Sequence, residues 1–303
     1  MLEAGLIVSR FIHYTATLTL FGVSLFPLYT YAKFTAAPYM RRVTPWLTTL
    51  AALLSAVVWF TCVTISMAGR LDGAAVWSVL SETSFGKIWM ARVILVTIIF
   101  AMATRQLQLP TKRMSWLVPV LCAGLLVSLA GVGHTQTANW MTHVVHMSAD
   151  GLHLLAAGAW LGGLVSLFSL VVRAVRTSTP VCDAEASHAA ARFSGMGYIA
   201  VAALIGSGLI NSWFLVGSLA NLGTPYGQLL IVKLVLFAGM LSLAGLNRFI
   251  IVPRLIKAND GGDAAWLIRL CPSHSWRTSF GRRSHFDRER ARYDAASYQL
   301  KTR

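Results

Sequence analysis

Seven long apolar segments dominate this sequence, and each is close to the length that crosses a lipid bilayer. They cover residues 6–31, 45–68, 86–104, 114–133, 141–172, 193–219 and 226–251. A spanning helix needs roughly 20 apolar residues, and lipid forces the backbone into helices because it offers no hydrogen-bond partners. Charged residues make up only 12% of the 303 residues, against about 25% in a soluble domain. The sequence therefore predicts an all-α, polytopic transmembrane helix bundle with seven spans.

Basic residues alternate between the loops, and this alternation predicts the orientation of the chain. Three Lys or Arg residues lie near or just beyond the end of each of the first, third, fifth and seventh segments. The loops after the fourth and sixth segments contain none. Positively charged loops remain on the cytoplasmic side of a membrane. We therefore expect the N-terminus outside the cytoplasm and the C-terminus inside it.

The last part of the chain differs from the rest in composition. Residues 263–303 contain nine basic and four acidic residues and no apolar run. Residues 1–262 are thus predicted to form the transmembrane domain, and 263–303 a basic, polar and disordered cytoplasmic tail. Such a tail is attracted to anionic lipid headgroups, so membrane lipid is the expected partner and nucleic acid is not.

Histidines are concentrated around the start of the fifth segment. Three histidines and one carboxylate follow one another in steps of three, four and three residues, which places them on one face of a helix. They are His143, His146, Asp150 and His153, with His134 at the end of the fourth segment. His13, about two turns into the first segment, is expected in the same leaflet.

These six side chains predict a metal site that faces the outside of the cell. Imidazole suits copper, zinc, iron and nickel, and a carboxylate can ligate the ion or orient an imidazole. The spacing does not select one metal. The alternative for the histidines is a position at the membrane interface, bonded to water and headgroups. A b-type haem remains a further alternative, because two histidines on facing helices, such as His13 and His153, can ligate haem axially.

A small-residue pattern in the fifth segment predicts close helix packing. Gly158 and Gly162 are four residues apart, as in a GxxxG face that lets two backbones approach. We expect Gly206 and Gly208 of the sixth segment to lie against this face.

Several motifs that are typical of nucleotide-binding proteins and hydrolases are absent from the sequence. It contains no phosphate-binding GxxxxGK[ST] loop, no GxSxG nucleophile elbow and no HExxH zinc motif. ATP-driven pumping and hydrolase chemistry are therefore not expected, and we do not expect an enzyme.

Three stretches resemble the copper resistance protein D family (CopD/PcoD). They read SADGLHLLAAGAWLGGL at 148–164, SGLINSW at 207–213 and RFIHY at 10–14. The resemblance covers about residues 5–262. It implies a multi-pass protein of the bacterial inner membrane, with its N-terminus in the periplasm and a role in copper homeostasis. It also implies a periplasmic copper-binding partner of the CopC type and import of copper into the cytoplasm.

One departure from the family concerns the last helix. Members of the family usually have eight spans, whereas this chain continues after residue 265 as a basic and polar sequence. We interpret the tail as the product of a shifted reading frame that replaces the eighth helix.

Overall fold

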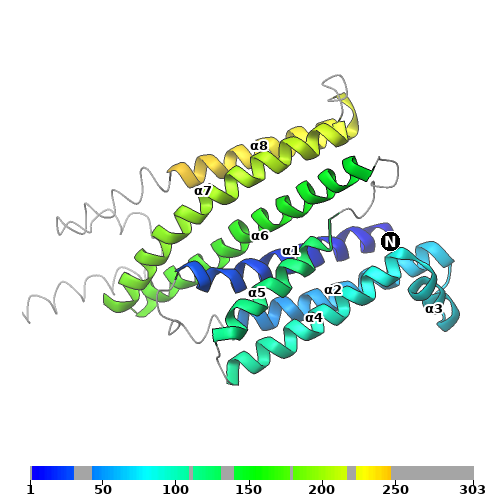
Figure 1. Cartoon of the computed structure of the whole chain (residues 1–303), viewed down its shortest axis with the longest axis horizontal. Helices are drawn as coiled ribbons and strands as arrows, with labels where there is room; N and C mark the ends of the chain where they lie inside the picture. Colours follow the sequence, from blue (N-terminus) through cyan, green and yellow to red (C-terminus); the bar gives the residue numbers. More distant parts are fainter. Residues whose placement is uncertain are drawn as a thin grey trace, which may run out of the picture. The chain divides into compact units, whose positions relative to one another are not determined.

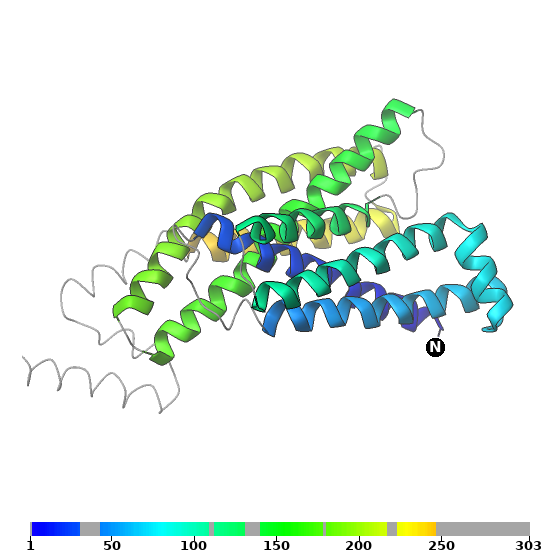
Figure 2. The same cartoon turned by 60° about the horizontal axis from the view of Figure 1, so that its bottom comes forward.

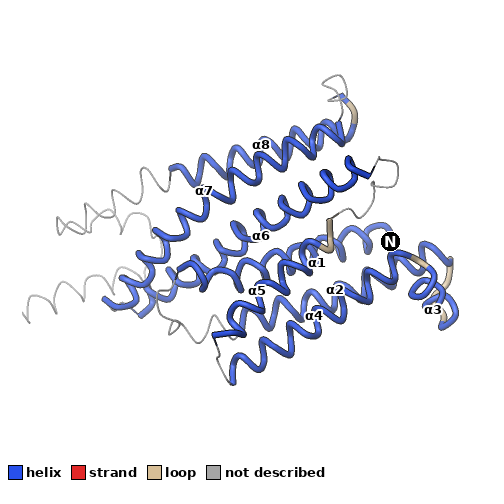
Figure 3. The backbone as a smooth tube through the Cα atoms, viewed as in Figure 1, coloured by secondary structure: helices blue, strands red, loops and turns tan. Residues whose placement is uncertain are grey.

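The structure is a computed structural model that describes residues 2–30, 43–108, 112–130, 140–177, 180–216 and 223–246. No β-strand occurs in these ranges, which are built from helices (Figures 1 and 3). The helices are α1 (Leu2–Thr30), α2 (Val43–Ala68), α3 (Gly73–Glu82), α4 (Ser84–Gln108), α5 (Lys112–Val127), α6 (Trp140–Thr177), α7 (Pro180–Val216) and α8 (Pro225–Leu246).

The chain divides into two compact units, Met1–Gly227 and Gln228–Arg303. In the first unit α1 packs against α2, α5, α6 and α7. Its most extensive contacts are with α2 and α6, while α6 packs in turn against α7 (Figure 2). Helix α4 lies against α2 and α5. Most of the apolar helix α8 belongs to the second unit. The predicted all-α bundle is confirmed, and the predicted tail lies outside the described residues.

In the described part of the chain, six helices are long and apolar enough to cross a membrane, namely α1, α2, α4, α6, α7 and α8. The remaining predicted span, residues 114–133, corresponds to α5, whose apolar part covers only Trp116–Val127. Pro119 lies inside α5, and the turn that follows the helix tightens. There the Leu129 N–H donates to the Leu126 carbonyl at an N···O distance of 3.1 Å, which is the three-residue spacing of a 3₁₀ turn. The chain is therefore a multi-pass membrane protein, and the described apolar part of α5 is shorter than the other six candidate spans.

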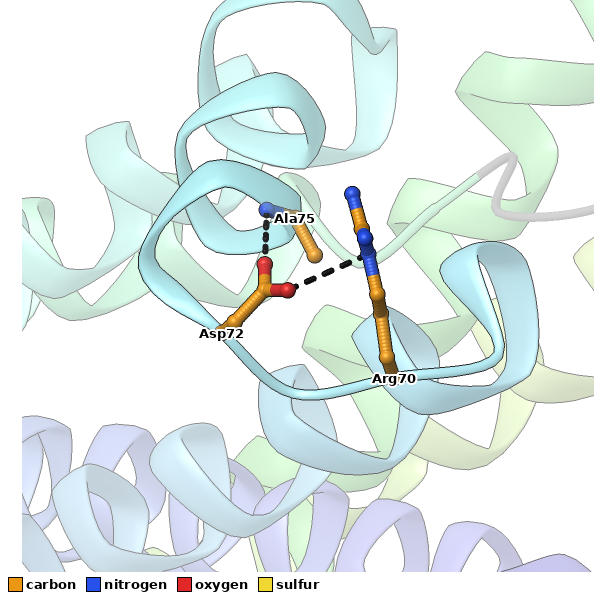
Figure 4. Close-up of polar contacts among 3 residues, drawn as sticks. All are labelled: Arg70, Asp72 and Ala75. Carbon is orange, nitrogen blue, oxygen red and sulfur yellow. Dashed lines mark hydrogen bonds and ion pairs between the residues drawn. The ribbon is translucent and has the colours of Figure 1, made fainter.

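Helix α3 was not predicted from the apolar pattern, because it is short and lies between two spans. Its start is fixed by Asp72, whose Oδ1 accepts a hydrogen bond from the Ala75 N–H at 2.8 Å (Figure 4). The second carboxylate oxygen lies 3.2 Å from Arg70 Nε (Figure 4). A side-chain cap of this kind is worth about 1 kcal/mol, whereas an exposed ion pair adds little. The buried residues Ala75 and Val79 lie one turn apart on one face of the helix.

The α1–α6 interface is a direct contact between backbones. A Cβ added at Gly22 of α1 would overlap the Gly158 carbonyl oxygen of α6 and come within 2.5 Å of the Gly162 Cα. The GxxxG face therefore packs closely, as predicted, but its partner is α1. The expectation for α7 was wrong: an added Cβ at Gly206 would meet nothing within 4 Å, and Gly208 lies beside the His153 ring.

The apolar core of the first unit is formed by side chains of α1, α2, α4, α5 and α6. Leu20, Trp59, Ile99 and Leu125 belong to it, and each is at most 1% exposed. Several buried hydroxyls of α1 and α2 bond to their own backbone, as Thr17 Oγ1 does to the His13 carbonyl at 2.9 Å. Such bonds satisfy a hydroxyl without a second helix. Thr64 Oγ1 of α2 has no partner in the described part of the chain.

We predict that Gly22→Ala destabilises the protein by about 1–3 kcal/mol, the usual cost of overpacking. The added methyl group meets backbone atoms, which cannot move aside as a flexible side chain can. Gly206→Ala is the matched control, because its methyl group has free space and alanine favours a helix by about 1 kcal/mol. Thermal unfolding in detergent measures both variants, and equal melting temperatures for the two would contradict the prediction.

Candidate metal site

The predicted stripe of α6 lies on a continuous helix. His143, His146, Asp150 and His153 all fall within Trp140–Thr177, and each is partly buried. The helical spacing on which the prediction rested is therefore confirmed. His134, the fifth member of the predicted cluster near α6, lies outside the described residues.

Two of the stripe histidines contact α7. The Nδ1 atom of His153 lies 3.0 Å from Ser207 Oγ. Two turns earlier along α6, the His146 ring stacks on Phe214, with ring centroids 5.2 Å apart and an interplanar angle of 29°. The two helices run antiparallel, so residues later in α6 contact residues earlier in α7. One face of α7 therefore covers this part of the stripe.

The hydrogen bond to Ser207 determines which nitrogen of His153 carries the proton. Ser207 Oγ donates its one proton to the Ala203 carbonyl at 2.5 Å, so it accepts from His153. Nδ1 of His153 is therefore protonated, and in the neutral ring Nε2 carries the lone pair. A metal-ligating histidine usually has this arrangement, with one nitrogen held by an outer partner and the other directed to the ion.

His13 has the same tautomer, but its ring contacts α2 and not α7. Its Nδ1 lies 3.1 Å from the Ala52 carbonyl oxygen and 3.2 Å from Ser55 Oγ, both on α2. A carbonyl only accepts, so Nδ1 carries the proton and Nε2 the lone pair. The His13 residue is only 1% exposed, and its buried Nε2 has no hydrogen-bond partner within the described part of the chain.

The surroundings of His13 are positively charged. Its ring centroid lies 5.6 Å from that of Trp59, and the guanidinium carbons of Arg10 and Arg92 lie 5.4 Å and 5.8 Å from the same indole. Arg92 is only 3% exposed. It donates from Nε to Ser128 Oγ at 3.0 Å and from Nη2 to the Ser128 carbonyl. Two neighbouring cations oppose the binding of a metal cation at His13, although the tautomer suits a ligand.

The five predicted residues that the structure describes do not form one cluster. His13 contacts α2, whereas His146 and His153 contact α7. Within the described ranges, no three His, Cys, Asp or Glu side chains are close enough to hold one ion together. The complete metal site remains a prediction, because His134 lies outside these ranges.

Sequence reasoning missed the residues of α7 that support the stripe. Ser207, Asn211 and Phe214 follow one another in steps of four and three, so they share one face of α7. The same spacing rule that identified the α6 stripe could have singled them out. It could not have shown that this face lies against His146 and His153.

Two family models match the sequence. The model of the N-terminal domain of copper resistance protein D-like proteins matches residues 1–144, and the model of copper resistance protein D matches residues 187–274. The chain is also 32% identical over 270 residues to the copper resistance protein D of Pseudomonas syringae pv. tomato, covering 84% of this chain and 85% of the relative. The chain belongs to the copper resistance protein D family. The resemblance seen in the sequence is thereby confirmed.

Two further proteins are similar to the chain. The inner membrane protein YebZ of Escherichia coli (strain K12) is 28% identical over 284 residues, covering 88% of this chain and 91% of the relative. The copper transport protein CutJ of Bacillus subtilis (strain 168) is 30% identical over 259 residues, covering 81% of this chain and 46% of the relative. No solved structure matches the chain.

We predict that histidine NMR of isotope-labelled protein shows a proton on Nδ1 of both His13 and His153. Ser207→Ala should change the resonances of His153 and leave those of His13 as they are, because only His153 bonds to that hydroxyl. Ser212→Ala is the matched control, since this hydroxyl bonds to the Gly208 carbonyl at 2.7 Å. A His153 spectrum that is the same in wild type and Ser207→Ala would contradict the assignment.

Proposed function

We propose that this chain is a copper-handling protein of the bacterial inner membrane that captures copper at the α6 stripe. The observation that carries the proposal is the placement of His146, Asp150 and His153 on one face of a spanning helix, with the two histidines against α7. Membership of the copper resistance protein D family supports copper as the substrate. The names of the Escherichia coli and Bacillus subtilis relatives support the inner membrane and transport.

The chemistry of the stripe suits a metal cation better than the surroundings of His13 do. The imidazole of His153 presents a lone pair on Nε2, and the Asp150 carboxylate offsets the positive charge of the ion. His13 instead lies near two guanidinium groups. His13 is accordingly proposed as a later and weaker contact, reached after copper leaves the stripe.

The length of α6 supports capture from the aqueous side. A helix of 38 residues is about 57 Å long at 1.5 Å per residue, whereas the hydrocarbon of a bilayer is about 30 Å thick. An upright α6 therefore extends beyond the hydrocarbon, and His143 and His146 lie within its first two turns. With the N-terminus in the periplasm, these turns face a periplasmic copper carrier of the CopC type. Copper would then move toward the cytoplasm without a chemical reaction on the chain.

The b-type haem alternative is less well supported by the geometry. Axial ligation needs two imidazoles that face each other across one gap. His13 lies against α2 and His153 against α7, so the pair named from the sequence occupies two different helix interfaces. We therefore favour copper binding.

We predict that His146→Ala combined with His153→Ala lowers the copper content of the detergent-purified protein at least about tenfold, equivalent to ~1.4 kcal/mol. The cause is the loss of both imidazoles that contact α7. His188→Ala is the control, because this histidine lies outside the stripe and its Nδ1 contacts the Thr30 carbonyl at 3.1 Å.

Metal analysis gives the copper content, and an absorption spectrum of the same sample tests for haem. Copper that is unchanged in the double variant would overturn the assignment of the stripe. A haem absorption band that disappears in the double variant would favour the haem alternative instead.

We also predict the orientation of the chain from its loops. In a chain whose four cysteines are replaced by alanine, a cysteine at Ala74 of α3 should react with a membrane-impermeant maleimide in intact spheroplasts. A cysteine at Arg176, in the last turn of α6, should react only after the membrane is permeabilised. Both positions are exposed, so access depends on the side of the membrane. The reverse pattern of labelling would contradict a periplasmic N-terminus.

A further inference from the structure

Two positive charges lie together beside one aromatic ring of the bundle. The guanidinium pair consists of Arg10 on α1 and Arg92 on α4, whose guanidinium carbons lie 5.4 Å and 5.8 Å from the centroid of the Trp59 indole on α2. The face of an indole attracts a cation, which stabilises both side chains in this place. An indole is neutral, however, and in the described part of the chain neither guanidinium forms an ion pair with a carboxylate. Both positive charges therefore remain uncompensated within these ranges.

The register between α1 and α6 brings Tyr14 of α1 to the level of the stripe. The two helices run parallel (Figure 1), and a Cβ added at Gly158 of α6 would lie 3.3 Å from the Leu18 carbonyl oxygen of α1. One helical turn earlier in both helices, Tyr14 is level with Leu154 of α6, and both side chains pack against the same apolar core. Leu154 directly follows His153, the last residue of the stripe.

Tyr14 connects the guanidinium pair with the stripe electrostatically. The charges of Arg92, Asp150 and Arg10 all act on its phenol group. The phenol is held in place, because its hydroxyl donates to the Leu129 carbonyl at 3.2 Å. Asp150 is the carboxylate of the stripe, so the pair and the stripe both lie within electrostatic range of one side chain. Salt screens charges inside a protein much less than charges at its surface, and the field of the pair therefore reaches the stripe.

We propose that the guanidinium pair determines which ionic charge the stripe accepts, by shifting its choice toward monovalent Cu(I) and away from divalent cations. This inference rests on the proposed function of the stripe. The Coulomb energy is proportional to the product of the two charges. The pair therefore repels a divalent cation twice as strongly as a monovalent cation at the same place. Repulsion of the wrong ligand is a recognised source of specificity.

Arg10 is the member of the pair whose charge can be removed with the smaller disturbance. Arg10 is exposed, whereas Arg92 is only 3% exposed and donates to Ser128. Arg10→Gln removes the charge, and Arg10→Lys keeps it. Lys87→Gln is the matched control, because Lys87 is an exposed cation in the first turn of α4 and is not among the charges that act on Tyr14.

Donor chemistry offers a competing explanation for a preference for Cu(I). A thioether sulfur also favours Cu(I) over divalent ions, and Met147 is a partly buried neighbour of His146 on α6. The two explanations differ in what Arg10→Gln does. This substitution changes no donor atom of the stripe, so a preference that comes from sulfur would be the same in the variant and in wild type.

The test uses the full-length protein in detergent and measures two affinities. Cu(I) is supplied from its bicinchoninate complex, and Zn(II), a divalent ion without redox chemistry, is supplied from a chromophoric zinc chelator. Arg10→Gln should raise the affinity for Cu(I) about threefold and that for Zn(II) about tenfold, because the divalent effect is the square of the monovalent one. Arg10→Lys and Lys87→Gln should bind both ions as wild type does.

Three results would overturn the role of the pair. They are unchanged affinities in Arg10→Gln, lower affinities in that variant, and equal increases for the two ions. Damage to the fold lowers affinity, so it cannot imitate the expected increase. If copper is lost in the variant that combines His146→Ala with His153→Ala but Arg10→Gln binds as wild type does, the stripe stands and this inference fails. If the double variant keeps its copper, the proposed function fails, and this inference fails with it.

Discussion

The hydrocarbon of a membrane offers no hydrogen-bond partners, and the polar side chains of this bundle are arranged around that constraint. Thr17 bonds to its own helix, and the buried Arg92 reaches both polar groups of Ser128. Against this background, the buried polar atoms without a partner are informative. Among the described residues they include His13 Nε2 and Asn211 Oδ1. One lies near two cations, and the other is on the face of α7 that carries Ser207 and Phe214.

Hydropathy alone predicted most of the fold. Six long apolar helices coincide with predicted spans, because a continuous apolar run in a helix has few alternatives in lipid. The turn after α5 tightens to a three-residue spacing, which an apolar average does not register. The missed helix α3 has a local signal in Asp72, a residue type that commonly caps a helix start.

The candidate site was predictable within one helix but not between helices. The spacing of His143, His146, Asp150 and His153 placed them on one face of α6, and the structure contains that helix. Sequence spacing does not reveal which helix covers a face. The contact between His153 and Ser207 joins residues 54 positions apart, and His13 contacts α2 at Ala52 and Ser55. These pairings arise from tertiary packing, which a periodic pattern along one segment does not specify.

The glycine contact between α1 and α6 has a mechanical consequence for ion passage. Because Gly22 meets Gly158 and Gly162 backbone to backbone, separating or sliding these two helices would break a direct contact between their backbones. Helix α7 differs, since added Cβ atoms at Gly195, Gly197 and Gly206 would meet nothing, and each glycine weakens a helix by about 1 kcal/mol relative to alanine. We therefore expect a rearrangement that admits an ion to keep α1 and α6 together and to bend α7 at these unpacked glycines.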